Sequence, residues 1–444
     1  MRKLLTAFTA LTLVGGVSLG APARTLALVG SGVYWISTAP VGEGMDDGTS
    51  CASPTHQYDA TAEGEDQYFN DLLDDILTDV AEQEYASATI AICDADGGAQ
   101  QVYEMDADTP LINVEGVEIT IAGVLWDATS EADVAGAGDV VIDGMNTFDE
   151  EGAAVGGYSP FEFNNADVYI GYLTIRDAFD DVAGAAIHFE QGDSEFIYEL
   201  NLDHVVIDGA WINDGGGAGV YAEGSVTITD STFTDNRANG GDGGAIYASA
   251  GVELAALTTL TISNSQFYDS SASGSGGAIY TPAELFESLT IESNKFQRNT
   301  AGSQGGAIRV SRGTSGTSIT RNTFTENSAE QGGAVSINDG EDDSYLWSIT
   351  RNTFTKNRAT LNGGALHMAL DNSGNVVAPN VKRNGFKRNS APAAGAVVVE
   401  SDYGTGRAIL RRYERGLRGN SFQGNRATSE RRSPNIGVHF DVVR

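Results

Sequence analysis

The chain has few basic residues for its size. Its 444 residues include 26 Lys and Arg against 61 Asp and Glu, which gives a formal net charge of −35. Phosphate contacts require Lys and Arg, so this charge argues against nucleic acid as a partner. Residues 301–444 hold 19 basic and 12 acidic residues, which leaves 7 and 49 for residues 1–300. The acidic part is either a solvated surface or a half that binds cations, with Ca²⁺ as the candidate ion.

Long apolar runs are absent after the first residues. A basic start over residues 1–3 is followed by an apolar segment, residues 4–17, and by the small residues Ala21 and Ala23. This pattern predicts a secretory signal peptide over residues 1–23. No later run reaches 18 apolar residues, so we expect no transmembrane span in the mature chain. The protein is expected to be secreted or displayed at the cell surface, and its oligomeric state stays open.

Cysteine is nearly absent. Cys51 and Cys93 are the only two, and both lie in the exported part of the chain. An even pair in an oxidising compartment predicts a disulfide between them, with two buried free thiols as the alternative. Two cysteines are an incomplete ligand set for zinc, and we expect no metal site there.

A pair of short signatures repeats between Gly215 and Asn425. One is Gly-Gly-Ala followed by an aliphatic residue, as at 243–246, and the other is Phe-x-x-Asn, as at 324–327. The phenylalanines recur every 28 to 36 residues, and short alternating runs of apolar and polar residues precede them. This period predicts a solenoid built of one strand-and-turn unit per repeat. We therefore expect an all-β, right-handed parallel β-helix of about ten coils, with two or three short strands per coil.

Identical residues of successive coils should lie on top of one another in such a fold. The phenylalanines should form an internal stack, and the asparagines a hydrogen-bonded turn ladder in left-handed backbone. The glycine pair should permit a tight corner or a close backbone approach. A second asparagine row lies two residues before each phenylalanine, from Asn294 to Asn420. The expected main ladder residues are Phe233, Phe296, Phe324, Phe354, Phe386 and Phe422, with Asn299, Asn327, Asn357 and Asn389.

The ends of the fold differ from its middle. Residues 24–110 are expected to form an N-terminal cap region, in which an apolar stripe over residues 66–84 predicts an amphipathic helix above the first coil. Residues 88–92 are the expected first strand. Irregular coils should follow over 111–214, the repeat coils over 215–425, and a last strand with a basic tail over 426–444.

The strands after the Gly-Gly-Ala signature predict an outward-facing row. Because side chains alternate along a strand, the aliphatic residue after Ala and the residue two later should face the core, and the residue between them should face out. Three tyrosines begin this row and would form a flat stripe suited to sugar rings or to an apolar partner surface. The alternative is that they only stabilise the sheet by stacking. The expected row is Tyr221, Tyr247, Tyr280, Arg309, Ser336 and His367, and all but Ser336 are candidate ligand-binding residues.

The alternation of the two signatures resembles the polymorphic outer membrane protein repeats of chlamydia-type surface proteins, over about Gly215 to Asn425. The preceding region resembles secreted right-handed parallel β-helix proteins of the pectin-lyase-like superfamily. The first resemblance implies secretion, surface display and adhesion. The second admits polysaccharide lyases and glycoside hydrolases.

Catalytic candidates are few. A lyase requires an Arg or Lys base beside acidic residues, and Arg176 with Asp180 and Asp181 is the best match in the chain, with an ordinary surface ion pair as the alternative. We therefore expect a non-catalytic secreted or surface β-helix that binds glycan or cell envelope. A polysaccharide-active enzyme, either a lyase or a glycoside hydrolase, is the alternative.

Overall fold

The structure is a computed structural model of the chain. The signal peptide expected over residues 1–23, and Cys51, lie outside the described residues. Those residues are 31–37, 55–58, 68–82, 85–94, 101–105, 112–113, 117–127, 132–135, 140–148, 154–191, 197–251, 258–283, 286–313, 316–339, 347–370, 380–401, 417, 419–428 and 436–440.

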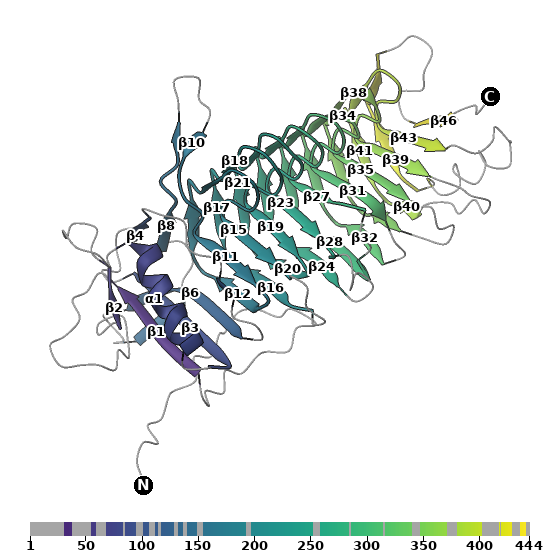
Figure 1. The fold of residues 1–444 in the computed structure, drawn as a ribbon. Helices are drawn as coiled ribbons and strands as arrows, with labels where there is room; N and C mark the ends of the chain where they lie inside the picture. The colour runs from purple at the N-terminus through teal and green to yellow at the C-terminus, as the bar shows by residue number, and fades with distance from the viewer. Residues whose placement is uncertain are drawn as a thin grey trace, which may run out of the picture.

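Four long sheets run side by side along an elongated solenoid (Figure 1), and their strands join parallel neighbours from successive coils. Sheet 1 contains, in spatial order, β2 (His56–Gln57), β1 (Ser31–Ser37), β3 (Ser87–Asp94), β6 (Glu118–Asp127), β12 (Asp167–Gly171), β16 (Glu199–Asp203), β20 (Ser225–Thr229), β24 (Thr259–Ser263), β28 (Ser288–Glu292), β32 (Thr317–Thr320), β36 (Ser348–Thr350) and β40 (Asn380–Lys382). The short β7 (Ala132–Ala135) pairs antiparallel with β6.

Sheets 2 and 3 follow sheet 1 around each coil. Sheet 2 contains β4 (Gln101–Glu104), β8 (Val140–Asp143), β13 (Thr174–Arg176), β17 (Val206–Asp208), β21 (Thr232–Thr234), β25 (Gln266–Tyr268), β29 (Lys295–Gln297), β33 (Thr323–Thr325), β37 (Thr353–Thr355), β41 (Gly385–Lys387) and β44 (Ser421–Gln423). Sheet 3 contains β14 (Phe179–Asp180), β18 (Trp211–Ile212), β22 (Arg237–Ala238), β26 (Ser271–Ala272), β30 (Thr300–Ala301), β34 (Ser328–Gln331), β38 (Arg358–Asn362), β42 (Ser390–Ala391) and β45 (Arg426–Ala427).

Sheet 4 closes each coil and carries the strands after the Gly-Gly-Ala signature. It contains β5 (Ile112–Asn113), β11 (Phe161–Asn164), β15 (Ile187–Glu190), β19 (Val220–Glu223), β23 (Ile246–Ser249), β27 (Ile279–Thr281), β31 (Ile308–Gly313), β35 (Val335–Asp339), β39 (Leu366–Leu370), β43 (Val397–Ser401) and β46 (Ile436–Phe440). A separate antiparallel hairpin joins β9 (Thr147–Phe148) to β10 (Ala154–Gly156).

The fold is the expected right-handed parallel β-helix, with one difference in the coil. A complete coil has four strands, as β24, β25, β26 and β27 show, whereas two or three were expected. The strands of sheet 3 are often only two residues long, and a two-residue strand is too short to show alternation in the sequence. The expected last strand is confirmed, because β46 pairs with β43.

The phenylalanine stack is confirmed. From Phe233 to Phe386 the rings are almost completely buried, and each lies face to face with the ring of the next coil. Phe324 and Phe354 have ring centroids 4.8 Å apart and planes only 6° from parallel. Phe267 belongs to the stack although Ser270 replaces its asparagine. Phe422 ends the stack and is only partly buried.

The asparagine ladder is confirmed in its bonding but not in its backbone. Asn327 Nδ2 donates to Asn357 Oδ1 of the next coil (3.0 Å) and to the backbone oxygen of Phe296 (3.1 Å). The second row, Asn294 to Asn420, bonds in the same way. The left-handed residue is the one before each asparagine, for example Glu326 with φ 58°. The expectation that Asn itself adopts this conformation is wrong, because its side chain must point inward along the ladder.

The two glycines of the signature have separate tasks. The first, such as Gly305 with φ +68°, occupies a backbone region that other residues rarely adopt. The second, such as Gly306, lies so close to the next coil that an added Cβ would come within 2.2 Å of the Gly333 oxygen. Both expectations for the glycine pair are therefore confirmed. The aliphatic residues that follow are fully buried, namely Ile246, Ile279, Ile308, Val335, Leu366 and Val397.

The N-terminal end is covered by α1 (Phe69–Glu82), which lies across the solenoid beside β1 and β3 (Figure 1). Phe69 is fully buried and contacts the rings of Tyr103 and Phe161 at 6.1 and 6.0 Å. The expected capping helix is thus confirmed. Residues 88–92 belong to β3, but they are not the first strand, because β1 pairs with β3 from the outer side. The rest of the buried stripe is Leu72, Leu73, Ile76, Leu77 and Val80.

Candidate functional site

The candidate site is the outer face of sheet 4, where one side chain per coil forms a continuous row. Register pairs the members of this row directly from β15 to β39. The chemistry of the row changes from aromatic to polar along the solenoid. Its members are His188, Tyr221, Tyr247, Tyr280, Arg309, Ser336 and His367.

The tyrosines form a stripe of half-buried rings, which we call the tyrosine stripe (Tyr221, Tyr247 and Tyr280). Tyr221 and Tyr247 stack with centroids 5.0 Å apart and planes 13° from parallel, and Tyr247 and Tyr280 lie 5.3 Å apart at 37°. The Tyr221 hydroxyl donates to Glu223 Oε1 at 2.9 Å. Burial and this neighbouring carboxylate raise the pKa of Tyr221, so its hydroxyl stays a donor.

An ion pair lies at the N-terminal end of the stripe. His188 Nε2 lies 3.0 Å from Glu190 Oε1, and the His188 ring meets Tyr221 edge to face at 5.1 Å. Burial alone would lower the pKa of His188, but the hydrogen bond and charge of Glu190 outweigh it and raise that pKa. The same hydrogen bond lowers the pKa of Glu190. The aromatic stripe is therefore bordered by two carboxylates, Glu190 and Glu223.

The C-terminal part of the row is a buried polar chain. Arg309 Nη1 donates to Ser336 Oγ (2.8 Å) and Asn338 Oδ1 (2.9 Å), and Ser336 Oγ lies 3.0 Å from His367 Nδ1. His367 Nε2 lies 3.1 Å from Glu400 Oε2, although the two atoms are not aligned as a hydrogen bond. Burial lowers the pKa of Arg309 to about 10.

The expected exposure of this second part is wrong. Arg309, Ser336 and His367 are only 7, 0 and 1 % exposed. Strand register sets the direction of a side chain but not its exposure, and each of these side chains packs along the row against its neighbour one coil away. Of the predicted binding residues, only the three tyrosines are accessible enough to form a contact surface, with Arg309 at their border.

The predicted catalytic residues do not form one group. Arg176 Nε and Nη2 both bond to Asp143 Oδ2, at 2.8 and 2.6 Å, one coil earlier. No ion pair joins Arg176 to Asp180 or Asp181, which are both described. Asp180 accepts hydrogen bonds from the backbone of the turn that follows it, and Asp181 accepts one from a side chain of the next coil. Arg176 is therefore part of a surface ion pair, which was the alternative.

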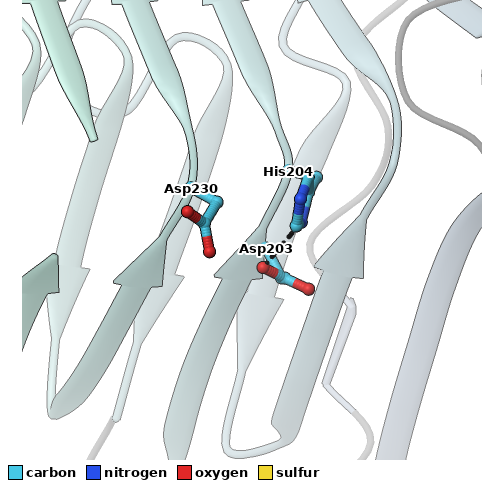
Figure 2. A group of neighbouring side chains, drawn as sticks. All are labelled: Asp203, His204 and Asp230. Carbon is cyan, nitrogen blue, oxygen red and sulfur yellow. Dashed lines mark hydrogen bonds and ion pairs between the residues drawn. The ribbon is translucent and has the colours of Figure 1, made fainter. Parts of the chain in front are cut away.

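A second cluster of titratable side chains lies where the chain passes from sheet 1 to sheet 2. Asp203, His204 and Asp230 place one ligand atom each within 4.8 Å of one another (Figure 2). Asp203 Oδ1 already accepts from Thr229 Oγ1 (2.8 Å) and lies 2.9 Å from His204 Nδ1, while the His204 ring stacks on Tyr172. Calcium prefers six to eight oxygen ligands, so this set with one nitrogen does not fit it. The expectation of Ca²⁺ on the acidic half stays untested.

Two overlapping stretches of the chain, residues 161–343 and 250–429, match the family model described as right handed beta helix region. Together they span residues 161–429, which is more than half of the chain. The chain belongs to the right-handed β-helix family. No curated protein and no solved structure matches it. Within the described residues of this β-helix, no helix has the length and apolar character needed to cross a membrane.

Sequence reasoning missed the residues that border the tyrosine stripe. His188 and Glu190 alternate on β15 in the sequence Ile-His-Phe-Glu, so both face outward, and this signal was available in the sequence. The strand lacks the Gly-Gly-Ala signature and was therefore not aligned with the repeats. The predicted Cys51–Cys93 pairing stays a prediction, with Cys93 fully buried on β3.

Proposed function

We propose that this β-helix is a secreted or surface-displayed binding protein whose tyrosine stripe holds a glycan chain or a cell-envelope polymer. The observation that carries the proposal is the continuous stack of three half-buried tyrosine rings on one flat sheet face. Sugar rings present apolar C–H faces that pack on aromatic rings, and an extended row suits a ligand of repeating units. We further propose that the Gly-Gly-Ala and Phe-x-x-Asn repeats are of the polymorphic outer membrane protein type, which supports an adhesive role.

The border of the stripe supports a polar ligand rather than an apolar protein surface. Glu190 and Glu223 can accept hydrogen bonds from sugar hydroxyls, and the Tyr221 hydroxyl already lies on Glu223. The guanidinium of Arg309 lies next along the row, buried and hydrogen-bonded to Ser336 and Asn338, and places a positive charge at the other end of the stripe. An aromatic floor with polar groups at its edges is the usual composition of a sugar-binding surface.

The test is a glycan array probed with the full mature chain, followed by the double substitution Tyr247→Ala and Tyr280→Ala. Each stacked ring contributes on the order of 1 kcal/mol, so binding should fall by roughly tenfold or more. The matched control is Tyr268→Ala, because Tyr268 lies on sheet 2 away from the row. Binding that survives the double substitution, in a variant that keeps its β-sheet circular dichroism, would contradict the proposal.

The same samples distinguish binding from turnover. Reducing ends and unsaturated sugar products are measured with each glycan that binds. The proposal expects binding without product, whereas product that accumulates with wild-type protein would favour the polysaccharide-active alternative.

A further inference from the structure

The outer face of sheet 2 carries two copies of the same motif with opposite charge. Residues 230–236 read Asp-Ser-Thr-Phe-Thr-Asp-Asn, and residues 351–357 read Arg-Asn-Thr-Phe-Thr-Lys-Asn. In both, the phenylalanine is buried and the flanking threonines face outward on β21 and β37. The charged positions correspond in the coil, so Asp230 and Asp235 occupy the places that Arg351 and Lys356 take further along.

The charge inversion extends one coil further on each side. One coil before Asp230 and Asp235, Asp203 and Asp208 pair in register with Thr229 and Thr234, the residues immediately before them. One coil after Arg351 and Lys356, Lys382 and Lys387 pair in register with Thr350 and Thr355, the residues immediately before them. The face therefore has an acidic end and a basic end of the same geometry.

Most of these charged side chains are exposed, and three of them form no ion pair within the described part of the chain. Asp230, Asp235, Arg351, Lys382 and Lys387 are exposed, and no ion pair joins Arg351, Lys382 or Lys387 to another described residue. Arg351 and Lys356 also have φ of 60° and 56°, a left-handed conformation that Gly or Asn adopts more easily.

We propose that two copies of this chain associate antiparallel through the outer faces of sheet 2. The Asp230 and Arg351 turns are four coils apart, with the Ser293 turn midway between them. A twofold axis that runs parallel to β29 between the two copies therefore places the acidic end of one copy over the basic end of the other. The acidic and basic turns are equally many coils from this axis. The resulting pairs, each formed twice, are Asp203–Lys382, Asp208–Lys387, Asp230–Arg351 and Asp235–Lys356.

The centre of this face is electrically balanced within each copy. Arg298 bonds to Asp269 (Nε–Oδ1, 2.6 Å), and Glu326 bonds to Lys356 (2.7 Å). The axis brings three like-charge pairs together at the centre, namely Glu326 with Asp269, Arg298 with Arg298 and Lys295 with Lys295. Asp269, Glu326 and Arg298 each already have an opposite charge in their own chain. Outward-facing threonines flank the phenylalanine on β21, β33 and β37, whereas β25 and β29 carry the longer Gln266, Tyr268, Lys295 and Gln297.

A second copy explains the face better than a polyanion does. A polyanion would contact only the basic end of this face. A second copy makes use of both ends.

The experiment uses charge reversal and sedimentation velocity of the full mature chain. The first variant, Arg351→Asp with Lys356→Asp, makes both ends acidic, and the second, Asp230→Arg with Asp235→Lys, makes both ends basic. Like charges then face each other, so each variant alone should dimerise roughly a hundredfold more weakly than wild type. An equimolar mixture of the two should form a dimer again, because acidic ends then meet basic ends at both sites.

Recovery of the dimer in the mixture also shows that both variants fold. Heparin is added to wild type as the polyanion probe. A wild-type chain that stays monomeric at tens of micromolar, whether or not it binds heparin, would overturn the proposal, as would variants that dimerise like wild type on their own. The tyrosine stripe lies on another sheet, so glycan binding by these variants reports on the proposed function separately.

Discussion

The N-terminal end and the repeat coils are held together by different kinds of contact. In the repeat coils the same phenylalanine and the same asparagine meet their own kind in the next coil, at 4.8 to 5.1 Å between ring centroids. At the N-terminal end each contact occurs once, as in the Phe69 contacts with Tyr103 and Phe161 and the Tyr58–Tyr103 pair at 4.8 Å. A ladder can be lengthened by adding coils, whereas a cap must fit one surface.

This difference predicts how many coils a destabilising substitution should affect. A solenoid is stabilised by each coil and its interface with the next, so a defect in the array should affect mainly the neighbouring coils. The cap protects an open end with exposed strand edges and core, so losing it should affect every coil near it.

Phe354→Ala should have the largest effect. It removes a fully buried ring from the middle of the stack, which should lower the free energy of unfolding by about 3–5 kcal/mol. Hydrogen exchange should show lost protection in the coils of Phe324, Phe354 and Phe386, while α1 stays protected. Phe422→Ala, at the partly buried end of the stack, is the control with a smaller expected effect. An equal loss of protection in α1 would contradict the prediction that a defect in the array affects mainly the neighbouring coils.

The Cys51–Cys93 disulfide should hold the cap region together. Closing a loop of about 40 residues should contribute on the order of 3–4 kcal/mol in the chain-entropy model. Thiol titration of the denatured, unreduced mature protein should find no reactive thiol. If two react, the disulfide is absent and the cap depends on packing alone.

The interior of the fold was predictable from the sequence, whereas much of the exterior was not. Phe324 and Phe354 could be placed because identical residues stack on identical residues, and the Gly-Gly-Ala strands because alternation fixes their inner face. Arg309 and His367 could not, because their burial depends on side chains one coil away, about thirty residues along the chain. The acidic and basic copies of the Thr-Phe-Thr motif can be read directly in the sequence. Only the strand register shows that they occupy equivalent turns.

Asn327→Ala should have an intermediate effect in the array. Asn327 Oδ1 accepts from both the backbone and the side chain of Asn299, at 2.9 and 3.1 Å. Leaving these buried donors unsatisfied should lower the free energy of unfolding by about 2–3 kcal/mol. Asn327→Ser should lower it less, since Ser270 occupies this position naturally one turn of the ladder before Asn299. Urea unfolding measures both, and a serine variant as unstable as the alanine variant would show that the ladder requires the amide.

The smallest effect should come from the His188–Glu190 pair, where the irregular coils meet the array and a single ion pair takes the place of a ladder. The pKa of His188 is raised above 6.5, so its contribution is complete below 6.5 and is lost as pH rises through the raised value. The pKa of Glu190 is lowered below 4.5, so its contribution is complete above 4.5 and is lost as pH falls through the lowered value. The pair should therefore stabilise most between about pH 5 and 6.5.

Glu190→Gln measures this contribution, and the partial exposure of Glu190 limits it to about 0.5 kcal/mol. The difference in unfolding free energy between wild type and Glu190→Gln should be present at pH 5.5 and nearly absent at pH 8.5. His188→Gln should show the same pH dependence, because it removes the other half of the same pair. A difference in unfolding free energy that stays constant from pH 5.5 to 8.5 would mean that the two side chains contribute through packing, as the ladder residues do. The contrast between single contacts and ladders would then not extend to this row.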